Sequence, residues 1–485
     1  GIDVVFDDEL PPGVLALSEP LTYTDLKYLG EKTSPGFAPI LRSRLQLASD
    51  LAGRGQASYS DEFFATLVHE FGHTLGLQHS MTGGAMSTSV TRGTSKANPL
   101  TADDVAGISV LYPTPEFAVY TGSVTGKVSV GGVGANLASV VALASDGTAV
   151  GSMTLPDGTY RIDGLPPGDY LIYAHPLPPA QQGEANPAGI VPPQDLVHQP
   201  FLAAAAFETR FYPGTTDWTQ AAKVKVLAGR TTTGVAFSLQ PITSSGIFNL
   251  RVFAYLGANR DKIVHAPPVP VGFRDWLAVQ ATGILTGGQI AAGLKFAAIG
   301  DGAKLEQNTL RNFPGSDQFL LIVGDGLAAT KATPVAVVMS TDSDLYVLPN
   351  AFTVVPSKHP SVTSVDGYTD PQARPHAIVT GTNITADARI LLDGAEVLSK
   401  TQRDDGAWDV EAPPASSEHV AAVEVFGPDG QTAAQLLAGA TPLKFTYPVR
   451  TDGGQLLTPG EMVAGTDATI TVDAPFADFL DAVSY

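Results

Sequence analysis

The apolar pattern of this 485-residue chain changes at about Pro115, and this change constrains the fold more than any other feature. Before it, apolar residues between Phe64 and Leu75 recur at positions i, i+3, i+4, i+7 and i+11, which predicts one buried face of a helix. After it, short alternating stretches are separated by Gly, Pro and Asp turns, the pattern of β-sandwiches. A chain of this length is too long for one core. We therefore expect a multidomain protein, with an α+β domain followed by three all-β domains.

The composition excludes several classes of protein. The net charge of -20 leaves no basic surface for nucleic acid, so we expect no nucleic-acid partner. The absence of cysteine excludes disulfides, thiolate metal sites and cysteine nucleophiles. We see no apolar run long enough for a transmembrane segment, which needs about 18 residues. The absence of cysteine is compatible with a secreted or cell-surface protein of a bacterium, which is the location we expect. The chain opens on Gly1 without a signal-like segment, which we interpret as a processed or excised piece of a longer precursor.

The part after Pro115 divides into three predicted sandwiches. Residues 116–241 resemble a carboxypeptidase-regulatory-like, transthyretin-type domain, on the runs 122–126, 156–162 and 164–170. Within them, residues 175–207 are predicted to be a long loop rich in Pro and Ala. Residues 242–356 are predicted to be Ig-like. Residues 357–448 resemble an IPT/TIG domain, an Ig-like module of surface and secreted proteins, and residues 449–485 form a tail or the start of a further β domain.

The run from His69 to His79 carries the clearest chemistry. His69 and His73 are four residues apart on the predicted helix, so both rings project from one face and can reach one zinc ion. Gly76 can adopt a positive φ, end the helix and turn the chain back, which would bring His79 to the same ion. Three neutral histidines leave a fourth position for water. The spacing therefore predicts one catalytic Zn²⁺ bound by His69, His73 and His79; the alternative is a helix with surface histidines that bind nothing.

Glu70 follows the first ligand and should face the open position. There it would accept a proton from the zinc-bound water and pass it to the departing amine. In such sites zinc lowers the pKa of the water to about 7 and polarises the scissile carbonyl. Glu70 is therefore the predicted catalytic residue.

The extended histidine pattern resembles the metzincin metallopeptidases, and among them the matrixins. In this resemblance Met86 is the methionine of the Met-turn beneath the zinc, with Met81 as a weaker rival. Residues 101–112 resemble the last matrixin helix, predicted here to begin at Thr101 and to end before Pro113. One of the aspartates Asp103 and Asp104 should brace the Met-turn; as bare residues they fit equally well in a solvated first turn.

The same resemblance implies a zincin-type domain over residues 1–113. Residues 2–6 are predicted to be a core strand, and residues 13–17 an edge strand whose Val14, Leu15 and Ala16 bind an extended peptide as an added strand. An ordinary sheet strand remains the alternative for both. The loop from Met86 to Pro99 would form the wall of the specificity pocket.

The chain also departs from the matrixin pattern. Two further strands and a long helix normally precede the position of Ile2, so the domain is expected to be N-terminally incomplete. No histidine precedes His69, which leaves a second, structural zinc without visible ligands. A calcium ion is compatible with the sequence, although no residue pattern argues for it. The other histidines, including His175, are expected in loops or on the surface, and Trp218 is one of three tryptophans that fit either a core or a ligand platform.

Two functions from different classes fit these observations. The first is a zinc endopeptidase that hydrolyses proteins or peptides, with the β domains as spacers or attachment modules. The second is a structural or adhesive surface protein in which the incomplete peptidase domain is non-catalytic and assembles with neighbours. Carbohydrate binding by the sandwiches could accompany either function, on fold analogy alone.

Overall fold

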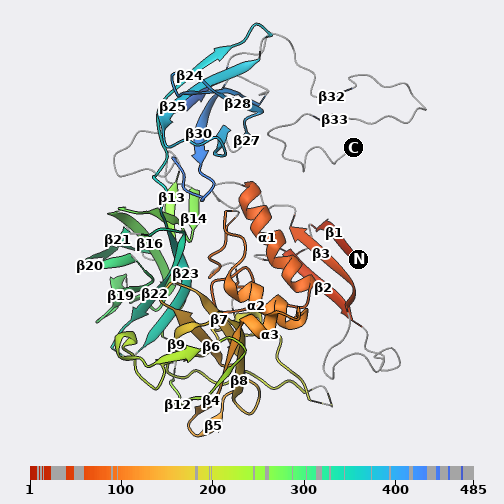
Figure 1. Ribbon diagram of the computed structural model, residues 1–485, viewed down its shortest axis with the longest axis vertical. Helices are drawn as coiled ribbons and strands as arrows, with labels where there is room; N and C mark the ends of the chain where they lie inside the picture. Colours follow the sequence, from red (N-terminus) through yellow and green to blue (C-terminus); the bar gives the residue numbers. More distant parts are fainter. Residues whose placement is uncertain are drawn as a thin grey trace. The chain divides into compact units, whose positions relative to one another are not determined.

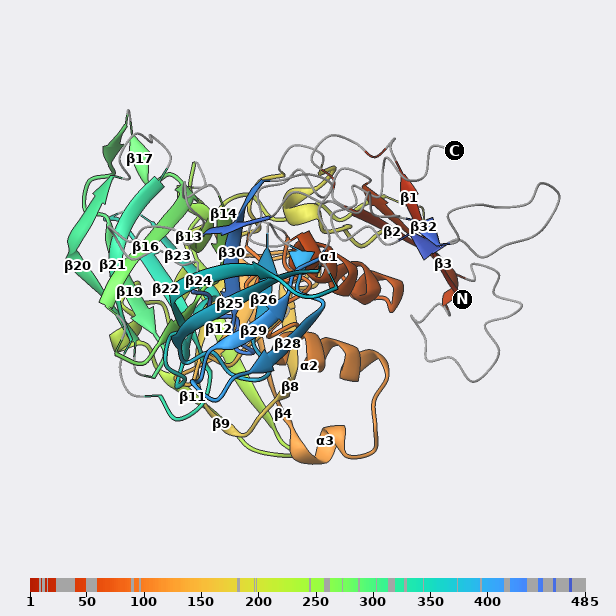
Figure 2. The same cartoon turned by 90° about the horizontal axis from the view of Figure 1, so that it is seen from above.

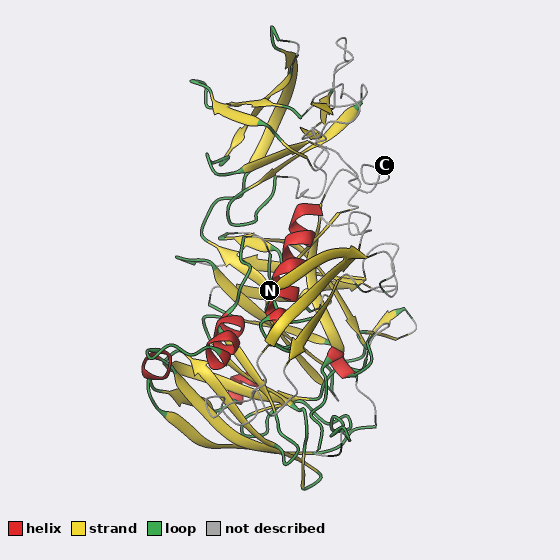
Figure 3. Ribbon diagram, turned by 90° about the vertical axis from the view of Figure 1, so that its right-hand side faces the viewer, coloured by secondary structure: helices red, strands yellow, loops and turns green. Residues whose placement is uncertain are grey.

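The fold was obtained as a computed structural model, and strands dominate it (Figure 3). The structure describes residues 1–7, 10, 14, 16–22, 40–48, 59–88, 91–95, 97–180, 184–195, 197, 199–243, 246–256, 262–272, 274–286, 288–301, 303–312, 319–326, 329–342, 344–372, 374–392, 395–413, 419–433, 444–447, 457–458 and 471–472. Among these residues, none of the helices combines the length and the apolar character needed to cross a bilayer. The chain forms two compact units. The first comprises Gly1–Leu51, Ser60–Ala254 and His265–Pro356; the second comprises Ala52–Tyr59, Tyr255–Val264 and Ser357–Tyr485.

A small mixed sheet and three helices make up the start of the first unit (Figure 1). Their bounds are β1 Ile2–Asp7, β2 Ala16–Thr22, β3 Ile40–Ala48, α1 Tyr59–Thr74, α2 Ala102–Leu111 and α3 Phe117–Tyr120. The sheet order is β1-β3-β2, with β1 parallel and β2 antiparallel to β3. Within the described part of residues 1–113, these elements do not make up the zincin-type α+β domain that the resemblance implies, so the structure does not support that part of the predicted fold.

The prediction that residues 2–6 form a core strand is wrong in its burial. In β1, Ile2, Val4 and Phe6 are 41%, 48% and 61% exposed. They share a face with Leu45 and Leu47 of β3, which are fully buried. Among the described residues β1 pairs with β3 alone, so its apolar side chains lie at the sheet edge, where no neighbouring strand covers them.

Helix α1 forms as predicted, but its buried face is not the apolar one. Phe71 and Leu75 are 39% and 43% exposed, whereas Thr66, His69 and Glu70 are buried. The reason is that the described segment packed against this part of α1 is the loop that follows it, which meets the histidine face. The buried face of α1 therefore carries polar residues of the candidate site, and its apolar residues Phe71 and Leu75 do not belong to a core.

Helix α2 confirms the predicted boundaries. It begins after Thr101, whose side chain and that of Asp104 form a capping box, and it ends at Leu111. Both aspartates of its first turn are buried, so the solvated alternative for Asp103 and Asp104 is wrong.

The first sandwich follows α3 and consists of two sheets. Its elements are β4 Gly122–Val130, β5 Val133–Gly134, β6 Ser139–Ala144, β7 Ala149–Met153, β8 Thr159–Leu165, β9 Gly168–His175, η2 Pro187–Gly189, β10 Arg210–Phe211, η3 Trp218–Gln220, β11 Lys223–Val226 and β12 Thr231–Leu239. One sheet has the order β10-β9-β6-β7 with β11 beside β9; the other has β12-β4-β5 with β8 beside β4. Alternate residues such as Val140, Ile162, Ile172 and Phe237 fill the core between them. The described residues between His175, which ends β9, and Arg210, which begins β10, form a long connection; the predicted loop of residues 175–207 is confirmed except for His175 itself.

The second sandwich completes the first unit (Figure 2). Its strands are β13 Phe248–Leu256, β14 Lys262–His265, β15 Pro268–Pro270, β16 Arg274–Thr282, β17 Leu285–Thr286, β18 Gln289–Ile290, β19 Lys295–Ile299, β20 Ala303–Asn312, β21 Phe319–Gly326, β22 Thr333–Ser340 and β23 Leu345–Val355. The sheets have the orders β14-β13-β16-β21-β20 and β15-β23-β22-β19.

These two sandwiches share a buried apolar interface. Val141, Tyr173 and Phe211 on the outer face of the β10-β9-β6-β7 sheet pack in one cluster with Ala336 and Val347 of the second sandwich. Burial of large apolar side chains on both sides holds the two domains together. The two sandwiches therefore belong largely to the same compact unit.

The second unit contains the third sandwich. Its strands are β24 Ser361–Thr369, β25 Pro375–Thr382, β26 Arg389–Leu392, β27 Ala395–Glu396, β28 Ser399–Gln402, β29 Trp408–Glu411, β30 Val420–Phe426 and β31 Lys444–Thr446, followed by β32 Leu457–Thr458 and β33 Thr471–Val472. The sheets β24-β25-β29-β28 and β27-β26-β30-β31 enclose a core that includes Trp408 and Phe445. The chain is thus mostly β-sandwich, as predicted. Most of residues 449–485 lie outside the described residues, and the five predicted domain limits stay predictions.

Candidate metal centre

The end of α1 places the first two histidines and turns the chain toward the third. His69 and His73 lie one turn apart on α1, which ends at Thr74. Gly76 has a φ of 96°, and its N–H donates to the His73 carbonyl at 2.9 Å. The N–H of Leu77 donates to the Gly72 carbonyl at 3.0 Å. This pair of bonds is a Schellman motif, so the prediction that Gly76 ends the helix is confirmed.

The three rings converge on one point. The ring centroids of His69, His73 and His79 are 4.7, 4.9 and 5.2 Å apart. One ring nitrogen from each lies within 4.8 Å of the others, and these residues are the group of potential metal ligands found among the described residues. The helix and the glycine turn therefore bring together the residues that the sequence predicts as ligands.

Backbone carbonyls hold each ring in one orientation. Each Nδ1 lies within hydrogen-bond distance of a carbonyl oxygen, at 2.6 Å for His69 with Ala85, 2.8 Å for His73 with Leu77 and 2.8 Å for His79 with Ala188. A carbonyl can only accept, so each Nδ1 carries the proton and donates it. All three Nε2 atoms therefore keep a free lone pair, the arrangement found in metal-ligating histidines.

The approach of two lone pairs is itself a test of the fit. The Nε2 atoms of His69 and His73 are 3.2 Å apart. With both protons on Nδ1, this contact has no hydrogen to share and is repulsive unless a cation lies between the nitrogens. Two nitrogens at about 2.0–2.1 Å from a tetrahedral zinc ion lie roughly 3.3 Å apart. The donor set therefore fits zinc.

Burial keeps the three histidines neutral. It lowers the pKa of His73 to about 4, lowers that of His79, and lowers that of His69 well below its ordinary value. The positive charge of Arg92 acts in the same direction on all three. Neutral imidazole is the form that binds a metal, so no proton has to be displaced near neutral pH.

Glu70 follows His69 on α1 and carries a buried carboxylate. It is 5% exposed, and its Oε2 has no hydrogen-bond partner among the described residues. Burial raises the pKa of Glu70 to about 7, against the opposing charge of Arg92. A buried acceptor without a partner lowers the stability of the fold by about 1–3 kcal/mol, or by more if it is charged. The Glu70 carboxylate is therefore better explained by a functional role than by a contribution to stability.

The loop after His79 passes beneath the helix. Met86 is 3% exposed, and a Cβ added at Gly72 of α1 would overlap its sulfur, so the methionine lies directly against the helix between the two histidines. Met81 is also buried but belongs to a separate apolar cluster. Asp104 accepts hydrogen bonds from the backbone N–H groups of Ala85 at 2.9 Å and Met86 at 3.1 Å. Asp104 is thus the aspartate that braces the turn.

Both sandwiches of the first unit also hold this loop. Asp103 accepts from the Thr82 hydroxyl at 2.7 Å and from the N–H of Gly151 in β7 at 2.8 Å. The Asn350 side chain of β23 donates to the Thr82 carbonyl at 3.2 Å. Backbone contact is so close that a Cβ at Gly83 would meet the backbone of the second sandwich. Sequence analysis missed these supports, because nothing local in the sequence relates positions so far apart.

The predicted substrate strand is shifted along the chain. Ala16 is the first residue of β2, Val14 precedes the strand, and Leu15 lies outside the described residues. Strand β2 lies at the end of the order β1-β3-β2, so among the described residues it has one edge without a neighbour. The edge therefore begins near the predicted run and continues to Thr22; its role in binding peptide stays a prediction.

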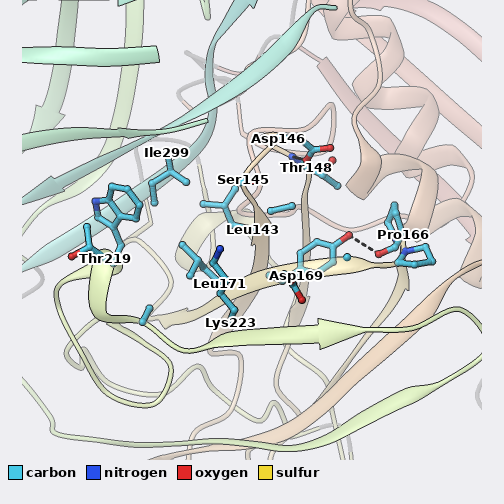
Figure 4. Close-up of a pocket in the computed structure, with 16 residues that line it drawn as sticks. Leu143, Ser145, Asp146, Thr148, Pro166, Asp169, Leu171, Thr219, Lys223 and Ile299 are labelled. Atoms are coloured by element: carbon cyan, nitrogen blue, oxygen red, sulfur yellow. Dashed lines mark hydrogen bonds between the residues drawn. The ribbon is translucent and has the colours of Figure 1, made fainter. Parts of the chain in front are cut away.

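Cavities adjoin the metal centre and the first sandwich. One, of about 420 Å³, is lined by His79 together with residues of α2, β7 and the loop around Met86. The other, of about 440 Å³, combines apolar Leu143, Leu171 and Ile299 with the carboxylates of Asp146 and Asp169 (Figure 4). Trp218 lines this second cavity, and the mixture of groups there indicates no particular class of ligand.

One histidine expected at the surface is buried. His175 ends β9, is 3% exposed, and lies between the rings of Tyr173 and Tyr346 at centroid distances of 5.7 and 6.0 Å. The prediction of a surface position is wrong, because the interface between the two sandwiches covers it.

Comparison with known proteins gives one family match. The matrixin family model matches residues 27–113, a minor part of the chain that contains the histidine triad. None of the curated proteins compared with the chain matches it.

Among solved structures, the chain is similar to the tandem Ig repeats of Dlar, with 12% identity over 41% of this chain and 98% of that one, at a TM-score of 0.16. It is similar to BcpA, the major pilin subunit of Bacillus cereus, with 10% identity over 68% and 95% of the chains, at a TM-score of 0.13. It is also similar to bovine butyrophilin, with 9% identity over 41% of this chain and 99% of that one, at a TM-score of 0.16. Such low TM-scores support no inference about function.

Proposed function

We propose that the chain is a zinc-dependent endopeptidase of the metzincin type, with one zinc ion held by His69, His73 and His79. The observation that supports this most directly is the pairing of three Nε2 lone pairs, aimed by carbonyl-bound Nδ1 groups, with the unpartnered carboxylate of Glu70. The matrixin match over the same residues agrees with it. In this proposal the protein acts on proteins or peptides outside the cell.

When bound, zinc would supply Lewis acidity, lowering the pKa of a coordinated water to about 7 and polarising a peptide carbonyl. Glu70 accepts the proton of the attacking water and then returns it to the leaving amine. Its burial favours this shuttle, because a pKa near 7 lets the carboxylate both take and release a proton near neutral pH. Met86 and Asp104 position the ring of His69 through the Ala85 carbonyl.

The peptide in this proposal lies along β2 as an added antiparallel strand. Backbone groups on the free edge of β2 would pair with the substrate backbone, which gives affinity without dependence on sequence. Val14, Leu15 and Ala16 were predicted for this role, and the strand bounds extend the proposal to residues 16–22.

The alternative is a structural or adhesive surface protein. It is favoured by the exposed apolar side chains of β1, which lie at one edge of the small sheet. Under this alternative the chain would bind zinc for stability, or not at all, and would cleave nothing.

Metal content and peptide hydrolysis, measured together, test the proposal. Wild type is compared with Glu70→Gln and with Glu116→Gln, an exposed glutamate at the start of α3. We expect about one zinc per chain in all three and casein cleavage by wild type and Glu116→Gln. Glu70→Gln should lose activity by about 10²–10⁴-fold, because the proton acceptor is gone while the ligands remain. Zinc without turnover in wild type would instead favour the structural alternative.

A further inference from the structure

The third ligand is positioned by a different domain from the other two. We call residues 184–190 the strap; it lies in the connection between β9 and β10 of the first sandwich and contains the short turn Pro187–Gly189. The Nδ1 of His79 donates to the Ala188 carbonyl of this strap at 2.8 Å. We propose that the strap is part of the metal centre, so that the sandwich determines how tightly zinc is bound. This rests on the proposed zinc site.

The backbone of the strap lies flush against the His79 ring. A Cβ added at Gly189 would lie 2.7 Å from both Cε1 and Nδ1 of His79, closer than any side chain can approach. Gly189 has a φ of 63°. Two separate requirements therefore select glycine here, the left-handed backbone and the contact with the ring.

Ala188 is held in a strained conformation. Its φ is 52°, which is uncommon for a residue with a Cβ, and it is 3% exposed. Such strain persists where the surrounding structure requires it, and it concentrates at functional sites. The left-handed conformation at Ala188 sets the direction of the carbonyl that receives the His79 proton.

The strap is anchored to the sandwich independently of His79. Ala188 and Ile190 are buried in a cluster with Met81, Leu137 and Leu177. Within the strap, the N–H of Gly189 donates to the Asn186 carbonyl at 2.9 Å. The carbonyl is therefore presented from a fixed support rather than from a free loop.

The acceptors of the other two ligands are nearer in the chain. The carbonyl that holds His73 is 4 residues away in the chain, and the one that holds His69 is 16 residues away, whereas the one that holds His79 is 109 residues away. If the strap moved, His79 would lose its acceptor, its proton could occupy either nitrogen, and its ring could rotate. Loss of such an outer partner typically weakens metal binding by about 10–100-fold.

The test measures zinc affinity of the full chain by competition with a chromophoric chelator. Gly189→Ala is compared with Gly131→Ala, whose φ of 57° is similar but whose added Cβ meets nothing within 4 Å. We expect zinc to bind Gly189→Ala about 10–100-fold more weakly than wild type, with Gly131→Ala unchanged. Bound cobalt should show a changed visible spectrum in Gly189→Ala alone.

A second pair of variants guards against misfolding of the first. Ile190→Ala loosens the strap without touching the ring, and Ile299→Ala, at the same 4% exposure, removes an equal side chain from the interface between the sandwiches. We expect weaker zinc binding for Ile190→Ala and wild-type affinity for Ile299→Ala. If wild type binds zinc and both strap variants, Gly189→Ala and Ile190→Ala, bind it equally well, the role of the strap is overturned while the proposed function stands. If wild type binds no zinc, the proposed function itself fails.

Discussion

Replacing Asp104 by asparagine should release the turn beneath the proposed zinc site. The carboxylate is 5% exposed and accepts four hydrogen bonds, from the N–H groups of Ala85, Met86 and Thr101 and from the Thr101 hydroxyl, at 2.8–3.1 Å. Both oxygens are used, because Oδ1 receives Met86 and Oδ2 receives the others. Asparagine has one acceptor oxygen, so one side of this arrangement would bring N–H against N–H.

The magnitude follows from the bonds lost. A buried N–H to a charged acceptor contributes about 1.5–3 kcal/mol, and a weakened helix cap costs about 1 kcal/mol more. Asp104→Asn should therefore lower the free energy of opening this turn by roughly 3 kcal/mol, which is on the order of 100-fold faster exchange of its amides. Zinc affinity should fall too, since the Ala85 carbonyl holds His69.

Amide hydrogen exchange is the suitable assay, because a protein of several domains need not unfold in one step. The control is Asp217→Asn, which removes an aspartate that caps the short helix Trp218–Gln220 and accepts from the N–H and hydroxyl of Thr219, outside this loop. The amides of Ala85 and Met86 should exchange faster in Asp104→Asn and at the wild-type rate in Asp217→Asn. Equal protection in Asp104→Asn and wild type would refute the bracing role.

Further predictions concern three supports of the same unit. Burial lowers the pKa of His175 to about 4, whereas a histidine in the unfolded chain has a pKa of about 6.5. Protonation therefore favours the unfolded state, and the free energy of unfolding should fall by about 3 kcal/mol as pH falls from 6.5 to 4. The melting temperature of His175→Phe should fall less than that of wild type over this range, and an equal fall in both proteins would contradict the prediction. Asn350→Ala should lower the free energy of unfolding by about 1–2 kcal/mol, because it loses the hydrogen bond to Thr82 and places alanine at a φ of 51°. Asn350→Gly should lose the hydrogen bond but not suffer the backbone strain, so thermal unfolding should show a smaller loss for glycine than for alanine. At Gly76 an added Cβ meets no clash, but the φ of 96° is unfavourable for alanine. Gly76→Ala should therefore displace His79, and a zinc titration should show weaker binding than in wild type. Unchanged affinity would argue that the glycine turn is not what brings the histidines together.

The convergence of His69, His73 and His79 was predictable because its causes are local. The spacing of His69 and His73 is a property of one helix, and a glycine before a third histidine three residues later is a property of one turn. The alternating pattern after Pro115 likewise predicted sandwiches, because each strand shows one face to a core. Helix α2 was predictable from its capping box and the proline that follows it.

The burial of individual faces was not predictable. Phe71 and Leu75 follow a helical pattern but are exposed, while the polar Thr66 is buried. Equally, nothing around position 188 or 350 in the sequence indicates a contact with the histidine site. Those contacts depend on how whole domains pack, which local periodicity does not encode.

The loop that carries the third ligand has a consequence for synthesis. Its supports come 48 residues later for Asp103 with Gly151, 109 residues later for His79 with Ala188, and 268 residues later for Thr82 with Asn350. At about 5–20 residues per second, the last of these appears on the order of tens of seconds after the histidines themselves. A nascent chain that has just formed helix α1 therefore lacks the distant groups that support the loop carrying His79. We expect the proposed peptidase to stay inactive until the second sandwich has folded.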